Sequence, residues 1–204
     1  MDMWICTGHW EMEGRKMADL AYDETKTNPQ YEIINGEVVM QARPAMYHIK
    51  IAGRLYNMFF NFLKGKRCEA FMEPDLFLNE NQNFIPDVVV VCNPDIIRQD
   101  GIYGAPDLVV EVLSPGTGKR DRKDKKDAYE AAGVREYWIV NPADKSIEAY
   151  HLVDGKLILD EVYQIYPDWQ WAKMSEEDRA KAMLAVKVSL YDDLVVDIRE
   201  IFEP

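Results

Sequence analysis

The sequence predicts one domain of the α/β or α+β class, built around a mixed β-sheet with helices. Three observations predict this class. Asn35-Gly36 and Asp154-Gly155 each indicate a hairpin, because both pairs tolerate the positive φ angles of a tight primed turn. A strand, a helix and a second strand follow one another over residues 107–140, which is typical of a crossover between parallel strands. The 204 residues, 48% of them hydrophobic, suffice for one buried core without a linker.

The predicted elements begin after a leader at residues 1–27, which has no clear periodicity, and fill a domain at 28–204. Apolar residues recur at helical spacing from Ile49 to Phe62, and Gly133 and Ser175 are suited to end one helix and begin another. The predicted order is a hairpin over 31–40, a helix over 48–63, strands over 73–78, 86–91 and 107–113, a helix over 120–132, a strand over 137–140, a hairpin over 147–163, an amphipathic segment after 175, and a strand or turn with a short helix within 188–202.

One predicted strand carries a charge where a buried strand is normally apolar. The run from Asp107 to Ser114 is rich in valine and leucine, with Glu111 inside it. A strand covered on both faces cannot hold an isolated ionised carboxylate, so Glu111 needs a cation, hydrogen bonds or a chemical role. A second valine-rich run starts at Asp87. Adjacent strand ends can bring Asp87 and Glu111 into one cleft.

The helix after the Glu111 strand supplies a candidate cation. Asp121, Lys125 and Tyr129 are spaced four residues apart and share one face, next to the inward side that contains Ala128. This phase separates Lys125 from its basic neighbours and directs it at Glu111. Two carboxylates with waters and a phosphate are a natural Mg²⁺ or Mn²⁺ environment. Such a metal acidifies a bound water, and a nearby lysine orients that water or stabilises the transition state.

A set of short motifs runs through the domain. They are Tyr31-Glu-Ile-Ile-Asn-Gly-Glu37, His48, Pro86-Asp-Val-Val-Val-Val91, Pro106-Asp-Leu-Val-Val-Glu-Val-Leu-Ser-Pro115, Asp121-x3-Lys125-x3-Tyr129 and Ala132-Gly-Val-Arg-Glu-Tyr-Trp-Ile-Val140. Together they resemble the Uma2 (DUF820) family of restriction endonuclease-like proteins, in the PD-(D/E)XK nuclease superfamily, over residues 25–203. The resemblance implies a restriction endonuclease-like core, with a central mixed sheet flanked by helices and with an N-terminal and a C-terminal hairpin. It also implies Mg²⁺-dependent endonuclease activity on DNA.

The resemblance assigns roles position by position. Asp87 takes the place of the superfamily aspartate and Glu111 that of the second acid, which makes both of them expected metal ligands. The standard lysine, two residues after that acid, is replaced by Leu113, and its role falls to Lys125 on the following helix. Gly116 stands where a second serine is common, which leaves the expected ligands intact. The expected catalytic set is Asp87, Glu111, Lys125, His48 and Glu37.

Two further matches lie nearer the N-terminus. His48 matches the family's histidine at the first long helix and is expected to line the cleft, although a satisfied, partly buried histidine is the alternative. Glu32 and Glu37 match acidic positions of the first hairpin. The other candidates have structural alternatives as well. Glu111 could pair with an internal cation, Asp87 could cap a turn, and Lys125 could only neutralise a carboxylate of its own helix.

Composition bounds the setting and the partners. No stretch approaches the roughly 18 uncharged apolar residues of a membrane span, and no secretory signal is visible. Cys6, Cys68 and Cys92 are scattered and odd in number, which argues against a disulfide framework. We therefore expect small buried thiols, a cytoplasmic location and no membrane contact. Because restriction-like folds commonly act as dimers, the resemblance also implies a homodimer.

The net charge of −12 opposes binding to bulk nucleic acid, since nonspecific affinity depends on cations. A DNA contact needs a local basic patch, for which Lys119-Arg-Asp-Arg-Lys-Asp-Lys-Lys-Asp127 is the candidate. The alternative for this segment is a solvated helix face laced with salt bridges. Two other functions stay open. One is a catalytically inactive nuclease-fold module for binding or assembly, and the other is a carboxylate-pair hydrolase of another bond, such as a glycoside.

Overall fold

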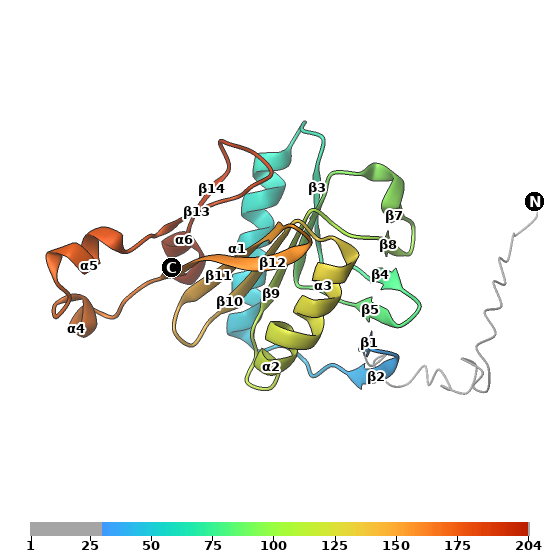
Figure 1. Ribbon diagram of the computed structural model, residues 1–204, viewed down its shortest axis with the longest axis horizontal. Coiled ribbons are helices and arrows are strands. Elements are labelled where there is room, and N and C mark those ends of the chain that lie inside the picture. Colours follow the sequence, from blue (N-terminus) through green and yellow to red (C-terminus); the bar gives the residue numbers. More distant parts are fainter. Residues whose placement is uncertain (1–29, 204) are drawn as a thin grey trace, which may run out of the picture. The chain divides into compact units, whose positions relative to one another are not determined.

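The computed structural model describes residues 30–203, apart from the side chain of Lys181, and the chain from Tyr31 onward forms one compact unit (Figure 1). The predicted leader at 1–27 and its boundary with the domain lie outside the described residues. The predicted mixed α/β character is confirmed. The prediction of a single central sheet is wrong, because the described strands form two six-stranded mixed sheets and a two-stranded one.

The first sheet has the order β2-β1-β5-β4-β8-β7, and the second has the order β12-β11-β10-β9-β6-β3. The strands of the first sheet are β1 (Tyr31–Ile34), β2 (Glu37–Met40), β4 (Leu76–Asn79), β5 (Gln82–Phe84), β7 (Ile97–Arg98) and β8 (Gly101–Tyr103). Those of the second are β3 (Glu69–Met72), β6 (Val88–Val91), β9 (Leu108–Val112), β10 (Glu136–Asn141), β11 (Ser146–Val153) and β12 (Lys156–Gln164). The small third sheet pairs β13 (Ala185–Lys187) with β14 (Val195–Asp197).

The helices connect and cover these sheets. They are α1 (Met46–Leu63), η2 (Pro94–Ile96), α2 (Gly118–Arg120), η3 (Asp121–Lys125), α3 (Lys126–Ala132), α4 (Asp168–Trp171), α5 (Glu176–Lys181) and α6 (Ile198–Phe202). Gly133 ends α3 with a φ of 88°, as predicted, and the Ser175 hydroxyl accepts the amide of Asp178 at the start of α5. Among the described helices, none combines the length and the apolar character that a membrane span requires.

Both predicted hairpins are confirmed. Asn35 and Gly36 turn β1 into β2 with φ angles of 52° and 79°, and Asp154 and Gly155 turn β11 into β12 with 49° and 75°. Positive φ at both positions matches the twist of the paired strands. The two hairpins join different sheets, which the turn residues do not reveal.

The prediction for residues 73–85 is right only in part: β4 overlaps the predicted strand over 73–78, but the polar turn is shorter than predicted and β5 was missed. Instead of one strand over 73–78 and a polar turn, the chain leaves the second sheet after β3, passes Glu73 at a φ of 50°, and enters the first sheet as β4. The polar residues Gln82 and Asn83 form part of β5, which lies between β1 and β4. Pairing with neighbours on both sides overrides the low strand propensity of these residues.

The second sheet separates two hydrophobic clusters. Val88, Val90 and Val110 face the cluster built on α1, whereas Val89 and Val109 face the cluster that contains α3. In Figure 1, α1 and α3 accordingly lie on opposite faces of this sheet. A strand buried on both faces is apolar throughout, which is why these runs contain little but valine and leucine. The predicted parallel crossover is confirmed by the β9–β10 pairing.

The buried stripe of α1 differs at one end from the prediction. Ile51, Leu55 and Phe59 are fully buried against the second sheet, but Ile49 is 39% exposed. Helical spacing permits either Ile49 or Ile51 to begin the stripe, and only the position of the sheet decides between them.

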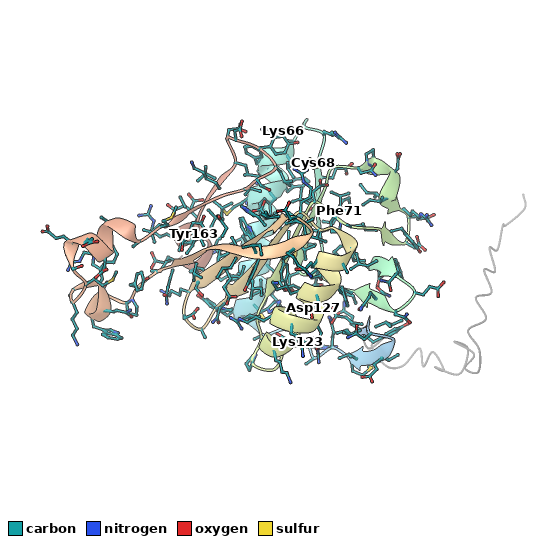
Figure 2. The ribbon with its side chains drawn as sticks, viewed as in Figure 1. Lys66, Cys68, Phe71, Lys123, Asp127 and Tyr163 are labelled. Carbon is teal, nitrogen blue, oxygen red and sulfur yellow. A yellow bond between two sulfur atoms is a disulfide. The ribbon has the colours of Figure 1, made fainter. Side chains whose placement is uncertain are left out.

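The cysteine prediction is also wrong. Cys68 and Cys92 form a disulfide bond, in the region where Figure 2 labels Cys68. Cys68 precedes β3 and Cys92 follows β6, and the antiparallel register that pairs Glu69 with Val91 sets the two cysteines opposite each other. A spacing of 24 residues carries no trace of this register. The argument for a cytoplasmic location from unpaired cysteines loses its support.

Replacing both Cys68 and Cys92 by serine is expected to lower the free energy of unfolding by about 3 kcal/mol, because the bond closes a long loop in the unfolded chain. Urea denaturation followed by circular dichroism measures the change, and a reductant should produce the same loss in the wild type. Cys6→Ser serves as the control and should leave the response to reductant intact. A wild-type denaturation curve that is the same with and without reductant would contradict the prediction.

Candidate active site

Asp87 and Glu111 lie on neighbouring strands of the second sheet. Val88 of β6 pairs with Val110 of β9, and continuing this antiparallel register by one residue sets Asp87 opposite Glu111. The side chains of both acids alternate with Val88 and Val110, so they share the face that α3 covers. Asp87 is tied to β9 directly, because its Oδ2 accepts the amide of Val112 at 2.6 Å. Strand pairing thus brings the two acids together, as predicted.

His48 holds the second oxygen of Asp87. It lies in the first turns of α1, and its Nε2 is 2.7 Å from Asp87 Oδ1. Burial alone lowers the pKa of His48, but the hydrogen bond to Asp87 and the charge of that carboxylate outweigh it, so the pKa lies above its ordinary value. His48 Nδ1 is buried and has no hydrogen-bond partner within the described part of the chain. The histidine therefore reaches the site, as predicted.

Lys125 comes from the helical segment between β9 and β10. This segment is α-helical at both ends, and its centre, η3, is a π-helical turn. The wider turn buries both Asp121 and Lys125, and the hydroxyl of Tyr137 donates to the main-chain carbonyl of Asp121 at 3.0 Å. π-Helical turns inside α-helices are frequent at functional sites. The helix phase predicted from the sequence is right, although the segment is not a regular α-helix.

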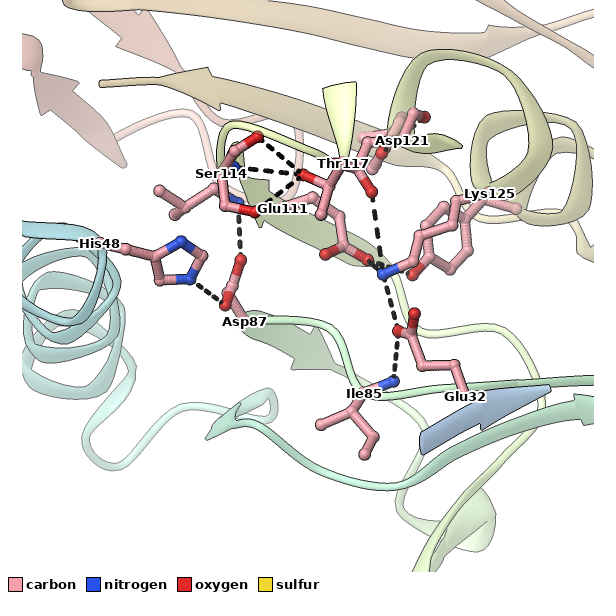
Figure 3. A network of polar contacts seen from close by, with 12 residues as sticks. Glu32, His48, Ile85, Asp87, Glu111, Ser114, Thr117, Asp121 and Lys125 are labelled. Carbon is pink, nitrogen blue, oxygen red and sulfur yellow. Dashed lines mark hydrogen bonds and ion pairs between the residues drawn. The ribbon is translucent and has the colours of Figure 1, made fainter. Parts of the chain in front are cut away.

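The Lys125 amine stands among carboxylates. Its Nζ is 2.7 Å from Glu32, 2.9 Å from Glu111 and 3.9 Å from Asp121 (Figure 3). Burial by itself lowers the pKa of Lys125, but these three negative charges outweigh it and raise the pKa above its ordinary value. The amine is therefore charged at neutral pH. A charged amine has no free lone pair with which to accept a proton.

Glu111 is shared between a cation and a hydroxyl. Its Oε1 accepts from Lys125 Nζ at 2.9 Å and from the Tyr129 hydroxyl at 2.7 Å. Burial raises the pKa of Glu111 well above its ordinary value, and Lys125 only partly opposes this. The strand that the sequence marked as unusual thus carries a carboxylate that is costly to ionise.

The site has an excess of negative charge. The buried charged side chains that meet here are Glu32, Asp87, Glu111, Asp121 and Lys125, none more than 8% exposed. Four carboxylates thus share one lysine and, at Asp87, one histidine. Removing carboxylates from water without matching cations is costly, so the cluster favours binding of further positive charge.

The site contains some residues that were predicted and others that were missed. Asp87, Glu111, Lys125 and His48 come together. Glu37 is exposed in the first hairpin and takes no part in the contacts that join these residues, so its role stays a prediction without support from this geometry. Glu32, two residues after the described chain begins, lies in the network instead. Strand alternation does not separate these two acids, because Glu37 pairs with Ile34, which is two residues from Glu32 and lies on the same face of the hairpin.

The donor set suits a hard divalent cation. Within residues 30–203, no three histidine, cysteine, aspartate or glutamate side chains form a ready-made metal cage. Mg²⁺, however, is usually held by one or two carboxylates together with waters and substrate phosphates. Asp87 and Glu111, directly opposite each other on paired strands, fit that requirement with carboxylate oxygens alone.

The basic segment divides into paired and unpaired cations. Arg122 binds Glu148 with its Nε 2.9 Å from Oε1, and Lys126 lies 3.9 Å from Glu130. Lys119 and Lys123 are exposed and form no hydrogen bond or ion pair within the described residues; Figure 2 shows Lys123 on the outer side of the helical segment. The segment thus agrees in part with both alternatives, a salt-bridged helix face and a basic patch, since some of its described cations are paired and others are not.

A hollow of about 360 Å³ lies elsewhere, between β12 and the α4–α5 region. Glu161, Gln164, Tyr166, Gln170 and Asp178 are among its lining residues. It contains none of the clustered carboxylates, so it does not change the choice of the candidate active site.

Fold and site together define a mixed α/β protein with a buried carboxylate–lysine cluster on paired strands. A family model described as "Uma2: Putative restriction endonuclease" matches residues 17–171, and the chain belongs to this Uma2 family. The chain is 32% identical over 134 residues to "Uncharacterized protein slr1290" of Synechocystis sp., covering 64% of this chain and 70% of that protein.

A solved structure shares the fold. The crystal structure of "a putative nuclease belonging to DUF820" from Anabaena variabilis matches with a TM-score of 0.66 at 21% identity, covering 87% of this chain and 92% of that one. The fold is therefore that of a DUF820 protein, as the sequence motifs predicted.

Proposed function

We propose that this protein is a Mg²⁺- or Mn²⁺-dependent endonuclease that hydrolyses phosphodiester bonds of DNA on a restriction endonuclease-like core. The observation that carries the proposal is a cluster of four buried carboxylates, three of which lie within 4 Å of one lysine. Such an excess of negative charge is stabilised when a cation joins it. A nuclease needs a site of this kind, because the metal ion supplies an acidified water and neutralises charge on phosphorus.

The residues of the chain divide the work. Asp87 and Glu111 would hold the metal with carboxylate oxygens. His48 orients Asp87 by a 2.7 Å contact, and Tyr129 orients Glu111 through its hydroxyl. Lys125 stays charged and contributes a cation at the transition state, where negative charge grows on the phosphoryl oxygens.

The proposed DNA partner is supported by local charge. The exposed Lys119 and Lys123 lie on the outer side of the helical segment that carries the buried Lys125, so this segment presents cations to solvent on a chain whose net charge is −12. Phosphate contacts by such lysines supply most nonspecific affinity for DNA. Binding should accordingly weaken with salt. We also propose that the protein is a cytoplasmic homodimer. The dimer is proposed because restriction-like folds commonly act as dimers.

The proposal is tested by cleavage and by metal binding. Purified protein is incubated with plasmid and with oligonucleotides in Mg²⁺, Mn²⁺ or a chelator, and we expect cleavage that the chelator abolishes. Calorimetric titration with Mn²⁺ should show binding that disappears when Asp87 and Glu111 are replaced together by Asn and Gln. A wild type that is inert on every DNA and binds no metal would overturn the proposal.

A catalytically inactive binding or assembly module is the second candidate. The observation that favours it is that both oxygens of Asp87 already have partners and that Lys125 already supplies a cation to Glu111. This candidate predicts DNA or protein binding without cleavage and without calorimetric heat on adding Mn²⁺. The same two measurements therefore separate the candidates.

A further inference from the structure

Glu32 reaches the site from the other sheet. It belongs to β1, whereas Asp87, Glu111 and Lys125 belong to the second sheet and its crossover helix. Only 1% of Glu32 is exposed, and its Oε1 lies 2.7 Å from Lys125 Nζ and accepts the amide of Ile85 at 3.0 Å. A carboxylate buried this deeply is kept only where its partners compensate for lost water.

We propose that Glu32 is a positioning residue: it fixes the amine of Lys125 beside Glu111, so that the site is complete only while the β1–β2 hairpin is docked. The proposal rests on the proposed nuclease function for its effect on turnover. The positioning itself can be tested without any activity.

The geometry separates this role from that of a metal ligand. In Figure 3, Lys125 Nζ lies between the carboxylates of Glu32 and Glu111. Glu32 therefore faces the amine and not the Asp87–Glu111 pair, and the donors it meets are an ammonium and an amide. Hydrogen bonds with an ionised partner are short and strong, as the 2.7 Å distance indicates.

Lys125 needs such a partner because its side chain is long and flexible. Holding a lysine in one rotamer costs conformational entropy that its contacts must offset. Glu111 alone offers one contact at 2.9 Å, and Asp121 is farther away at 3.9 Å. Glu32 supplies the shortest of the three contacts and comes from the opposite side, which restricts the amine to one place.

The same carboxylate couples the amine to the Asp87 strand. Ile85, whose amide donates to Glu32, stands two residues before Asp87 in the chain. A shift of the hairpin would therefore move the lysine contact and the approach to Asp87 together. Coupling of this kind requires one rigid link that both sides share.

Few contacts besides Glu32 hold the hairpin. Within the described residues, β1 joins β5 in register only at Ile33 and Asn83, the Gly36 amide donates to the Asn81 carbonyl, and Asn35 binds Gln82. Ile34 packs into the cluster that contains α3. Elements held by few buried contacts open at lower free energy than the core, so the Glu32–Lys125 pair contributes to docking as well as to the site.

The test measures how accessible the Lys125 amine is. Wild type, Glu32→Gln and Glu32→Ala are treated with a limiting amount of acetic anhydride, and acetylation of each lysine is quantified by mass spectrometry. We expect Lys125 to be protected in the wild type, and Glu32→Ala to raise its acetylation about tenfold or more, because a hydrogen bond between charged groups is lost. Glu32→Gln keeps an oxygen acceptor and should show a smaller rise.

Glu130→Ala is the matched control. Glu130 also accepts from a lysine, Lys156, at 2.7 Å and from a backbone amide, that of Leu157, at 2.8 Å, but away from the site. Its removal should leave Lys125 protected. A rise in Glu32→Ala confined to Lys125 supports positioning, whereas a rise that also appears at the half-buried Lys126 and Lys145 would mean general unfolding and overturn it. If Glu32→Ala does not fold, the isosteric Glu32→Gln serves as the test. The proposal is refuted if Lys125 is acetylated in Glu32→Gln to the same low level as in the wild type.

Turnover gives the second readout. With a cleavable DNA substrate, Glu32→Gln should lower kcat by about tenfold or more and leave KM within about threefold, because the amine acts in the transition state and not in ground-state binding. An unchanged kcat would count against positioning. If the wild type cleaves nothing, the proposed function fails, and the acetylation pattern still decides whether Glu32 positions Lys125.

Discussion

Replacing Lys125 by methionine is expected to lower the free energy of unfolding by about 3–5 kcal/mol at neutral pH, because it leaves buried carboxylates without their cation. Methionine keeps most of the volume, so the loss reports charge and not packing. Lys125 lies within 4 Å of Glu32, Glu111 and Asp121, and all three are nearly inaccessible to water. Urea denaturation at equilibrium measures the change.

The loss should depend on pH in a defined direction. Without Lys125, the carboxyl groups of Glu111 and Asp121, whose pKa values burial already raises, have still higher pKa values in the folded state. A carboxyl group with a raised folded-state pKa stabilises the fold as pH falls through that pKa. The gap between Lys125→Met and wild type should therefore shrink from about pH 8 to about pH 5.

Lys156→Met is the control for this substitution. Lys156 also contacts a glutamate, Glu130, at 2.7 Å, but its side chain is 71% exposed. Exposed pairs are screened by water and contribute little, so this variant should be close to wild type. Equal losses in the two variants would show that burial of the carboxylate cluster does not govern the effect.

Replacing Glu111 by glutamine is expected to lower DNA cleavage by at least about a thousandfold, because a carboxylate proposed to hold the metal ion becomes a neutral amide, which binds a divalent cation far more weakly. Stability should not fall. Glutamine keeps an oxygen that can accept from Lys125 and Tyr129, and it removes a charge whose burial raises the pKa of Glu111. Relief of such a buried charge is a common way in which loss of activity accompanies gain of stability.

Glu148→Gln matches this change outside the site. Glu148 also binds one cation and one tyrosine hydroxyl, with Arg122 Nε at 2.9 Å and Tyr150 at 2.7 Å. It should keep cleavage within about threefold of wild type, since charge removal at a distance acts only through weak, screened fields. Cleavage by Glu111→Gln at the wild-type rate would remove Glu111 from the proposed mechanism.

Local patterns in the sequence were sufficient for much of the fold. Asn35-Gly36 and Asp154-Gly155 predicted tight turns, and both hairpins are present in the structure. Glycine at position 133 ended its helix, and the valine runs became buried strands. Each of these depends on a backbone preference or a burial pattern that acts within a few residues.

Pairing between strands that lie far apart in the chain could not be predicted from the sequence. Residues 73–85 were assigned only partly because the chain changes sheets there and β5 pairs on both sides. Cys68 and Cys92 form a disulfide because β3 and β6 pair in one particular register. A stretch of local sequence does not state which strand will be its neighbour, and pairing energy can outweigh propensity.

The candidate site divides in the same way. The sequence by itself determined that Glu111 is anomalous in an apolar strand and that Lys125 shares an inward helix face with Asp121, because both follow from local periodicity. Only the tertiary structure decided that Glu32, and not Glu37, joins them, since a hairpin from another sheet delivers it. The physical reason is that charges interact strongly only within a few ångströms. The groups within that distance of Lys125 are brought there only when segments distant in the sequence pack together.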